Sequence, residues 1–320
     1  MRWQEEMIEN FFVQICTNYY QLWLPRSLIL IEHTVLFINY IGPSLIYLAQ
    51  KLMAVYTDQM GRKIELDHTP KRIISLVPSQ TELLHSLGLE KEVIGITKFC
   101  VHPHQWFLHK IKIGGTKQLD IDKIKNLQPD LIIANKEENE REQIEELASH
   151  FPVWISNVSN LEEALSMISS IGDILDRKKE SQELVKAIQI NFASFTPLTS
   201  NVKPKTCYLI WREPYMTVGG DTFINDMLKR AGLQNMFADK TRYPEITINQ
   251  LSSVNCQLLL LSSEPYPFKE KHIVELQIKL PGTKIILADG ELFSWYGSRL
   301  LKAPAYFQKL HQQIKTFELI

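Results

Sequence analysis

The sequence predicts an α/β protein in which two lobes, each built on a mostly parallel sheet, are joined by a single long helix. The first observation is an internal repeat: residues 121–137 align without a gap with residues 248–264. In each copy an amphipathic helix leads into an apolar run of strand length, and a polar loop follows that ends in Glu137 or Glu264. Because ligands gather at the carboxyl ends of covered parallel strands, two such copies predict two lobes that share one ligand.

The second observation is a regular alternation of apolar runs and helical patterns before residue 160, which is typical of a parallel sheet covered by helices. We interpret residues 78–81 as the loop after the first strand, and Gly88 as the end of the first helix. The remaining elements expected in this half are strands at 73–77, 93–97 and 153–156 and helices at 82–87 and 140–149.

The third observation is a long helical pattern between the two alternating regions. Asn160 is a candidate N-cap with Glu163 three positions later, and apolar residues recur at helical spacing as far as Phe195. One continuous helix over this range would be roughly 50 Å long at 1.5 Å per residue. Gly172 and the polar stretch 176–182 leave open the alternative of a bend or break.

The alternation resumes after residue 204, with strands expected at 206–211 and 283–288 and helices at 223–231 and 306–314. The fold class predicted is therefore two Rossmann-like lobes with mostly parallel sheets and a single backbone helix. The domains expected are an N-terminal extension of unknown role at 1–52, a first lobe at 53–159, a linking helix at 160–196 and a second lobe at 197–320.

Composition excludes several classes of function. The 320 residues carry a net charge of −1, and no basic stripe with interleaved aromatics occurs, which argues against nucleic acid as a partner. The four cysteines are scattered without a paired motif, which argues against a zinc ribbon or a disulfide scaffold. Nucleophile-elbow, zinc-protease and phosphate-loop motifs are absent from the sequence, so we predict that the protein is not an enzyme.

Residues 1–52 show neither a secretory signal nor a secure membrane span. The chain opens with Arg2 but continues with Glu5, Glu6 and Glu9, and polar residues interrupt the apolar stretch 28–48. Three interpretations stay open: a peripheral anchor, an appended helix pair, or upstream sequence outside the functional protein.

Four segments, residues 71–84, 93–97, 113–116 and 127–134, carry a resemblance to a known family. They resemble the first lobe of the class III substrate-binding proteins of ABC importers, and most closely the vitamin B12-binding proteins. The resemblance covers about residues 56–320. It implies a monomer that captures cobalamin, haem, a ferric siderophore or a metal ion between its lobes and delivers it to a membrane permease.

The loops at the predicted strand ends supply the candidate ligand-binding residues. Aromatic side chains at such positions suit a large, flat, partly apolar ligand, although they equally suit packing between lobes. The resemblance places Asp289 where the B12-binding relatives have an aspartate (the alternative is an N-cap), and Asn135 where they have a tryptophan. The full set is Pro78, Ser79, Gln80, Phe99, Cys100, His102, Asn135, Lys136, Trp211, Arg212, Tyr215, Tyr243, Glu264, Tyr266, Asp289, Trp295, Tyr296 and Arg299.

Cys100, His102, His104 and His109 form a metal-like cluster, since thiolate and imidazole are good ligands for zinc, copper or iron. His102 is the candidate metal ligand, because corrinoids and haem both accept an axial histidine. The alternative is a loop of surface histidines.

The resemblance also implies that an exposed glutamate on each lobe engages arginines of the permease. Glu140 and Glu142 are the candidates on the first lobe and Glu245 on the second. The function expected is the substrate-binding component of an ABC importer, placed in the periplasm or cell envelope. The alternative is a cytoplasmic protein that handles a corrinoid or metal, with or without enzymatic activity.

Overall fold

The computed structural model describes residues 53–197, 203–253 and 255–315. The extension predicted at residues 1–52 lies outside this part of the chain. The chain divides into two units, residues 1–54 and 55–320, and apart from Ala54, the first residue of β1, the description below concerns the second. Across the described residues, no helix has both the length and the apolar character that crossing a membrane requires.

The first lobe contains a five-stranded sheet in which every neighbouring pair is parallel, in the order β5-β4-β3-β6-β7. A small hairpin of β1 (Ala54–Thr57) and β2 (Lys63–Leu66) precedes it. The sheet consists of β3 (Ile73–Ser75), β4 (Val93–Ile96), β5 (Ile111–Lys112), β6 (Leu131–Asn135) and β7 (Val153–Ser156), with helices α4 (Pro78–Ser86), α5 (His104–His109), α6 (Ile121–Leu127) and α7 (Arg141–Ala148).

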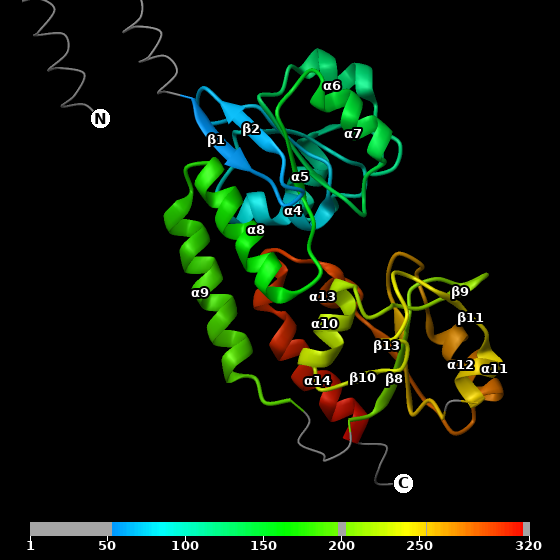
Figure 1. The fold of residues 1–320 in the computed structure, drawn as a ribbon. Coiled ribbons are helices and arrows are strands. Elements are labelled where there is room, and N and C mark those ends of the chain that lie inside the picture. Colours follow the sequence, from blue (N-terminus) through cyan, green and yellow to red (C-terminus); the bar gives the residue numbers. More distant parts are fainter. Residues whose placement is uncertain (1–52, 198–202, 254, 316–320) are drawn as a thin grey trace, which may run out of the picture. The chain divides into compact units, whose positions relative to one another are not determined.

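The second lobe contains a separate four-stranded parallel sheet in the order β10-β8-β12-β13 (Figure 1). Its strands are β8 (Lys205–Leu209), β10 (Gln234–Asn235), β12 (Leu258–Ser262) and β13 (Lys284–Ala288), and β9 (Tyr215–Met216) forms an antiparallel pair with β11 (Glu245–Ile246). Its helices are α10 (Phe223–Arg230), α11 (Ile248–Ser253), α12 (Glu270–Lys279), α13 (Glu291–Ser294), the 3-10 turn η2 (Ser298–Leu301) and α14 (Ala303–Lys315).

The internal repeat occupies the same place in both sheets. Strand β6 lies between β3 and β7, and β12 lies between β8 and β13, with α6 and α11 directly before them in the chain. All five residues of each repeated strand are buried. The predicted α/β fold of two lobes with mostly parallel sheets is confirmed. The loops that end in Glu137 and Glu264 begin at equivalent strand ends of the two sheets.

The predicted single long helix is wrong, and the alternative of a break is correct. Helix α8 (Leu161–Ile174) ends before Asp176, whose φ of 53° is left-handed, and α9 (Lys178–Ser194) turns back beside α8 (Figure 1). Gly172 permits this contact, because a Cβ there would overlap Ser181 of α9. The N-cap expected at Asn160 is confirmed: its side chain accepts from the Glu163 backbone N–H at 2.9 Å.

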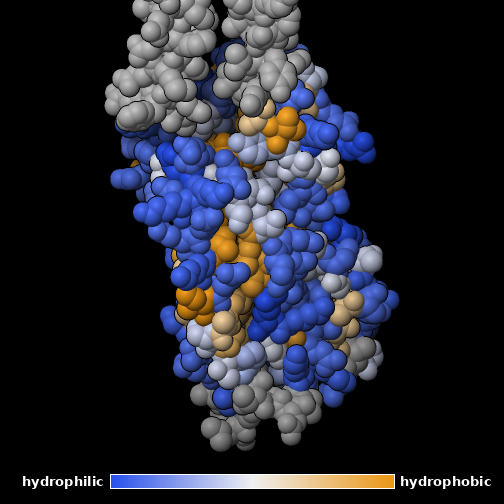
Figure 2. All heavy atoms as spheres, turned by 60° about the vertical axis from the view of Figure 1, so that its left-hand side comes forward, coloured by the Kyte–Doolittle hydropathy of each residue, from blue (hydrophilic) through white to orange (hydrophobic). Residues whose placement is uncertain are grey.

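One hydrophobic core connects the lobes. Alternate strand residues divide between faces: Ile73 and Tyr208 contribute to the shared core, which also contains Ile168 of α8 and Ile188 of α9. Their neighbours Ile74 and Cys207 belong to two smaller clusters on the outer faces of the sheets. Figure 2 shows apolar surface on the face that carries α9, where Ile190 is 55% exposed.

Candidate functional site

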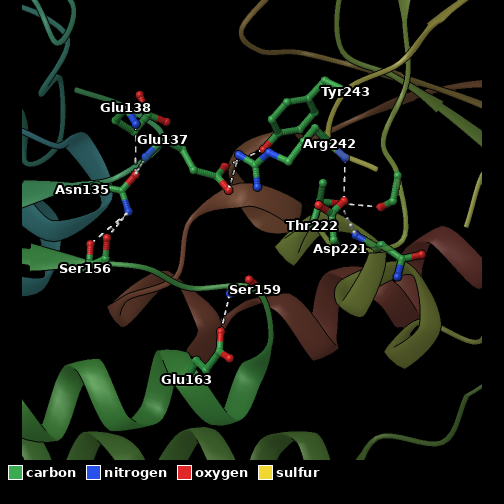
Figure 3. A network of polar contacts seen from close by, with 12 residues as sticks. Asn135, Glu137, Glu138, Ser156, Ser159, Glu163, Asp221, Thr222, Arg242 and Tyr243 are labelled. Carbon is green, nitrogen blue, oxygen red and sulfur yellow. Dashed lines mark hydrogen bonds and ion pairs between the residues drawn. The ribbon is translucent and has the colours of Figure 1, made fainter. Parts of the chain in front are cut away.

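The two lobes meet where the loop after β6 faces the second lobe (Figure 3). Glu137 accepts a hydrogen bond from the Tyr243 hydroxyl at 2.6 Å, and its other carboxylate oxygen lies 2.8 Å from a terminal guanidinium nitrogen of Arg242. Burial raises the pKa of Tyr243, and the neighbouring Glu137 carboxylate adds to the effect, so this hydroxyl stays a hydrogen-bond donor.

Asn135 shapes the loop that presents Glu137. Its side-chain oxygen accepts from the backbone N–H groups of Glu137 at 2.8 Å and Glu138 at 3.0 Å, and its amide nitrogen donates to the Ser156 carbonyl at 3.1 Å (Figure 3). The side chain is buried, and these bonds occupy both of its polar ends. Asn135, predicted from sequence as a ligand contact, therefore acts in this structure as a buried brace for the loop.

The segment carrying Arg242 is fixed by the loop before α10. The Arg242 backbone N–H donates to Asp221 at 2.6 Å, and its carbonyl accepts from the Gly219 N–H at 2.7 Å. A Cβ at Gly219 would lie 2.5 Å from the Lys240 carbonyl oxygen, so only glycine allows the two loops to approach this closely.

A second contact between the lobes centres on Arg299 of η2. Its guanidinium binds both carboxylate oxygens of Glu82 on α4, at 2.8 and 2.9 Å, and also pairs with Glu291 of α13. The same group lies 4.6 Å from the Trp295 ring centroid. His102 of the first lobe approaches Glu291 at 3.3 Å. Only 11% of the Arg299 side chain is exposed, so this is a largely desolvated, bidentate pair.

Glu264, at the end of the repeat in the second lobe, holds Trp295 in place. One carboxylate oxygen accepts from the Trp295 indole N–H at 2.8 Å and from the Ser294 hydroxyl at 2.6 Å. The ring of His102 meets Trp295 edge to face at 5.7 Å. Loss of water raises the pKa of Glu264 to about 7, and the nearby Glu291 carboxylate contributes in the same direction.

We define the interlobe site by the residues that make these contacts: Glu82, His102, Glu137, Arg242, Tyr243, Glu264, Glu291, Trp295 and Arg299. The sequence anticipated five of them as ligand-binding residues, namely His102, Tyr243, Glu264, Trp295 and Arg299. Tyr296, also predicted, is buried, and its ring meets Phe223 edge to face at 5.5 Å.

Sequence reasoning did not assign Glu82, Glu137, Arg242 or Glu291 to the ligand-binding set. Glu137 carried a usable signal, because it closes the repeat opposite Glu264. Glu138, beside it, faces the same region: its side chain reaches solvent, yet surrounding protein and the Glu137 carboxylate raise its pKa.

Four other predicted residues form a cluster within the second lobe: Trp211, Arg212, Tyr215 and Tyr266. Trp211 is 40% exposed and packs edge to face on Tyr266 with 5.8 Å between ring centroids. Arg212 pairs with Glu275 of α12 at 2.9 Å, and its charge lies near Tyr215. These contacts are all with residues of the second lobe, so they join the four predicted residues to one another and to α12.

The predicted ligand-binding residues of the first lobe also include Pro78, Ser79, Gln80, Phe99 and Lys136, which lie outside the interlobe site as defined above. Pro78, Ser79 and Gln80 were expected in a loop, but they form the first turn of α4, a position that suits proline because its missing N–H has no helical partner there. Gln80 is buried against Ser156. Phe99 and Lys136 are exposed.

Asp289 precedes α13 but does not cap it. The N-cap residue is Gly290 and no side chain caps the helix, so the alternative role of Asp289 as an N-cap is wrong. The Asp289 backbone N–H donates to the Tyr306 hydroxyl at 2.8 Å. The carboxylate of Asp289 lies close enough to Arg299 to support its charge.

The metal-like cluster does not form. Cys100 is wholly buried, its sulfur lies 3.1 Å from the hydroxyls of Thr81 and Thr97, and burial raises the pKa of its thiol. His104 and His109 are exposed on α5. Within the described residues, no group of three or more His, Cys, Asp or Glu side chains is placed to hold a metal ion.

The candidate docking glutamates lie on the surfaces of both lobes. Glu140 is the N-cap residue of α7 and pairs with Lys117 at 3.2 Å, while Glu142 is exposed in the first turn of the same helix. Glu245 is exposed on β11, opposite Met216 of β9.

Comparisons with known proteins agree with the two-lobed fold. A family model described as periplasmic binding protein matches residues 73–277. An ABC transporter substrate-binding lipoprotein of Bacillus subtilis is 25% identical over 207 residues, which span 62% of this chain and 65% of that protein. A vitamin B12-binding protein of Vibrio parahaemolyticus is 24% identical over 60% of this chain and 70% of its own length.

A solved structure, the periplasmic haem-binding protein of Vibrio cholerae, superimposes with a TM-score of 0.65 at 20% identity. The superposition covers 75% of this chain and 98% of that one.

Proposed function

Since the chain belongs to the periplasmic binding protein family, we propose that it is the substrate-binding component of an ABC importer. The observation that carries the proposal is the convergence of the two repeat ends. Glu137 follows β6 and binds Tyr243 and Arg242 of the second lobe, while Glu264 follows β12 and binds Trp295, whose ring meets His102 of the first lobe. A receptor that closes on a ligand needs this arrangement, because each lobe then contributes half of the contacts.

The cargo we propose is cobalamin or a related metal chelate, with haem or a ferric siderophore next in order. Trp295, Tyr243 and Tyr296 offer aromatic surface for a large flat ligand, and His102 supplies an imidazole for an axial position. The named relatives support this range: one is called a vitamin B12-binding protein and another a haem-binding protein. In the closed arrangement Trp295 and Tyr296 are buried, so cargo entry requires the lobes to separate.

The partner we propose is an arginine-bearing ABC permease, which a monomer would approach through Glu140, Glu142 and Glu245. A location in the periplasm or cell envelope follows from this role. Recovery of the native protein from the cytoplasmic fraction would instead favour the alternative of a cytoplasmic corrinoid- or metal-handling protein.

The test is direct binding. Purified protein is incubated with cyanocobalamin, haemin or ferrichrome, passed through a size-exclusion column, and scanned for co-eluting absorbance; mass spectrometry identifies any small molecule that survives purification. We expect one chromophore to co-elute in a one-to-one ratio. Trp295→Ala should weaken that binding at least tenfold, while the control Tyr56→Phe, on the β1–β2 hairpin, should leave it unchanged. Failure of all three ligands to bind would contradict the proposed cargo.

A further inference from the structure

The two arginines of the interlobe site are already occupied by carboxylates of the protein. Arg299 uses three nitrogens: Nε and Nη2 bind Glu82, and Nη1 binds Glu291. Arg242 uses its Nη2 on Glu137. In both cases a guanidinium of the second lobe is bound to a glutamate of the first lobe.

Guanidinium groups are the usual partners of ligand carboxylates, because their planar donors match two carboxylate oxygens at once. Here a ligand carboxylate that binds Arg299 must first displace Glu82 or Glu291, and one that binds the half-exposed Arg242 meets the Glu137 carboxylate on the same guanidinium. The displaced glutamate would then remain next to the bound anion, in a region that already contains Glu138, Glu264 and Glu291. Loss of water and the neighbouring carboxylates of Glu291 and Glu138 raise the pKa of Glu264, so added negative charge is disfavoured beside it.

On the basis of the proposed function, we infer that Glu82 and Glu137 determine ligand specificity. By occupying Arg299 and Arg242, they make the site select an uncharged chelate over a carboxylate-bearing one. An uncharged ligand has no need of either arginine. It gains contact with Trp295 and Tyr243 once the lobes part, and the arginine–glutamate pairs can re-form around it.

The experiment compares two probes that differ in charge: cyanocobalamin, which has no net charge, and haemin, which carries two propionates. Dissociation constants are measured for the wild type, Glu82→Gln and Glu137→Gln. We expect the wild type to prefer cyanocobalamin, and each substitution to tighten haemin binding at least tenfold while changing cyanocobalamin binding less than threefold. The gain should shrink in high salt, because it is electrostatic.

Two controls isolate the mechanism. Glu145→Gln removes the same charge from an exposed pair with Arg141 on α7, and should leave both affinities unchanged. Glu82→Gln combined with Arg299→Gln should abolish the gain, since the freed guanidinium is then missing. Circular dichroism checks folding, and if Glu82→Gln does not fold, Glu137→Gln provides the same comparison at Arg242.

The outcomes separate this inference from the proposed function. Cyanocobalamin binding with unchanged haemin affinity in both glutamine variants contradicts the inference alone. Tighter haemin binding that persists in the double variant also contradicts it, because the arginine is then not responsible. Binding of neither probe by any of the proteins contradicts the proposed cargo and this inference together.

Discussion

Glu264 combines burial, a tryptophan partner and a carboxyl group that titrates near neutral pH. Because its pKa is raised to about 7 in the folded protein, the folded state binds more protons than the unfolded state between about pH 4.5 and 7. The free energy of unfolding therefore falls as pH rises through this window. At pH 8 the deprotonated group costs at most about 3 kcal/mol, from 1.36 kcal/mol per pKa unit.

Glu264→Gln should remove most of this pH dependence, since the amide oxygen can still accept from Trp295 and Ser294. We expect the variant to match the wild type at pH 4.5 and to exceed it by about 1–3 kcal/mol at pH 8. Urea unfolding at four pH values measures the difference. Glu145→Gln, an exposed control, should follow the wild-type curve; equal slopes for the Glu264→Gln variant and the wild type would refute the assignment.

Asn135→Ala tests the brace beneath Glu137. It leaves the N–H groups of Glu137 and Glu138 without their acceptor in a partly buried setting, so we expect a loss of about 1–3 kcal/mol in the free energy of unfolding. Faster amide exchange at residues 136–139 should accompany it. Asn249→Ala, at an exposed position, is the control and should change stability by less than about 0.5 kcal/mol.

Single residues were predictable where a strand end alone decides their position. Glu264 follows that rule, because it comes just after β12, and it lies at the interlobe site. Glu82 does not, because its role depends on how α4 faces η2, and nothing in the local sequence encodes that pairing. Cys100 shows the opposite error: it sits in a loop by sequence, but the loop folds its thiol under Thr81 and Thr97.

The pair of helices α8 and α9 depends on one small residue. Alanine usually stabilises a helix relative to glycine by about 1 kcal/mol, yet a methyl group at Gly172 would overlap Ser181. We therefore expect Gly172→Ala to destabilise the protein by about 1–3 kcal/mol, and added Ser181→Gly to recover part of the loss. Thermal and urea unfolding measure both. Gly282→Ala, which would meet nothing within 4 Å, is the control.

Elements with strong periodicity were predicted well. The repeat fixed α6–β6 and α11–β12, because buried strands need a continuous apolar run. Helix α12 was missed, since Val274 and Ile278 are exposed and blur its amphipathic pattern. The break between α8 and α9 was also missed as the primary prediction: apolar spacing continues across it, and only Asp176 and Gly172 mark the reversal.

At the scale of the whole molecule, Gly297 sets how closely the lobes approach. A Cβ there would lie 2.9 Å from the Ser79 carbonyl oxygen of α4. We expect Gly297→Ala to push η2 away from α4 and to accelerate amide exchange in α4, which hydrogen–deuterium exchange measures. Gly282→Ala is again the control. Unchanged exchange in α4 would contradict the role assigned to Gly297.

Each sheet is drawn from one uninterrupted stretch of chain, residues 73–156 for the first and 205–288 for the second. During synthesis, the earlier half thus has every hydrogen-bonding partner of its sheet before the later half leaves the ribosome. Translation can therefore produce the protein in two successive folding events, and the packing of the two lobes against each other is the last step.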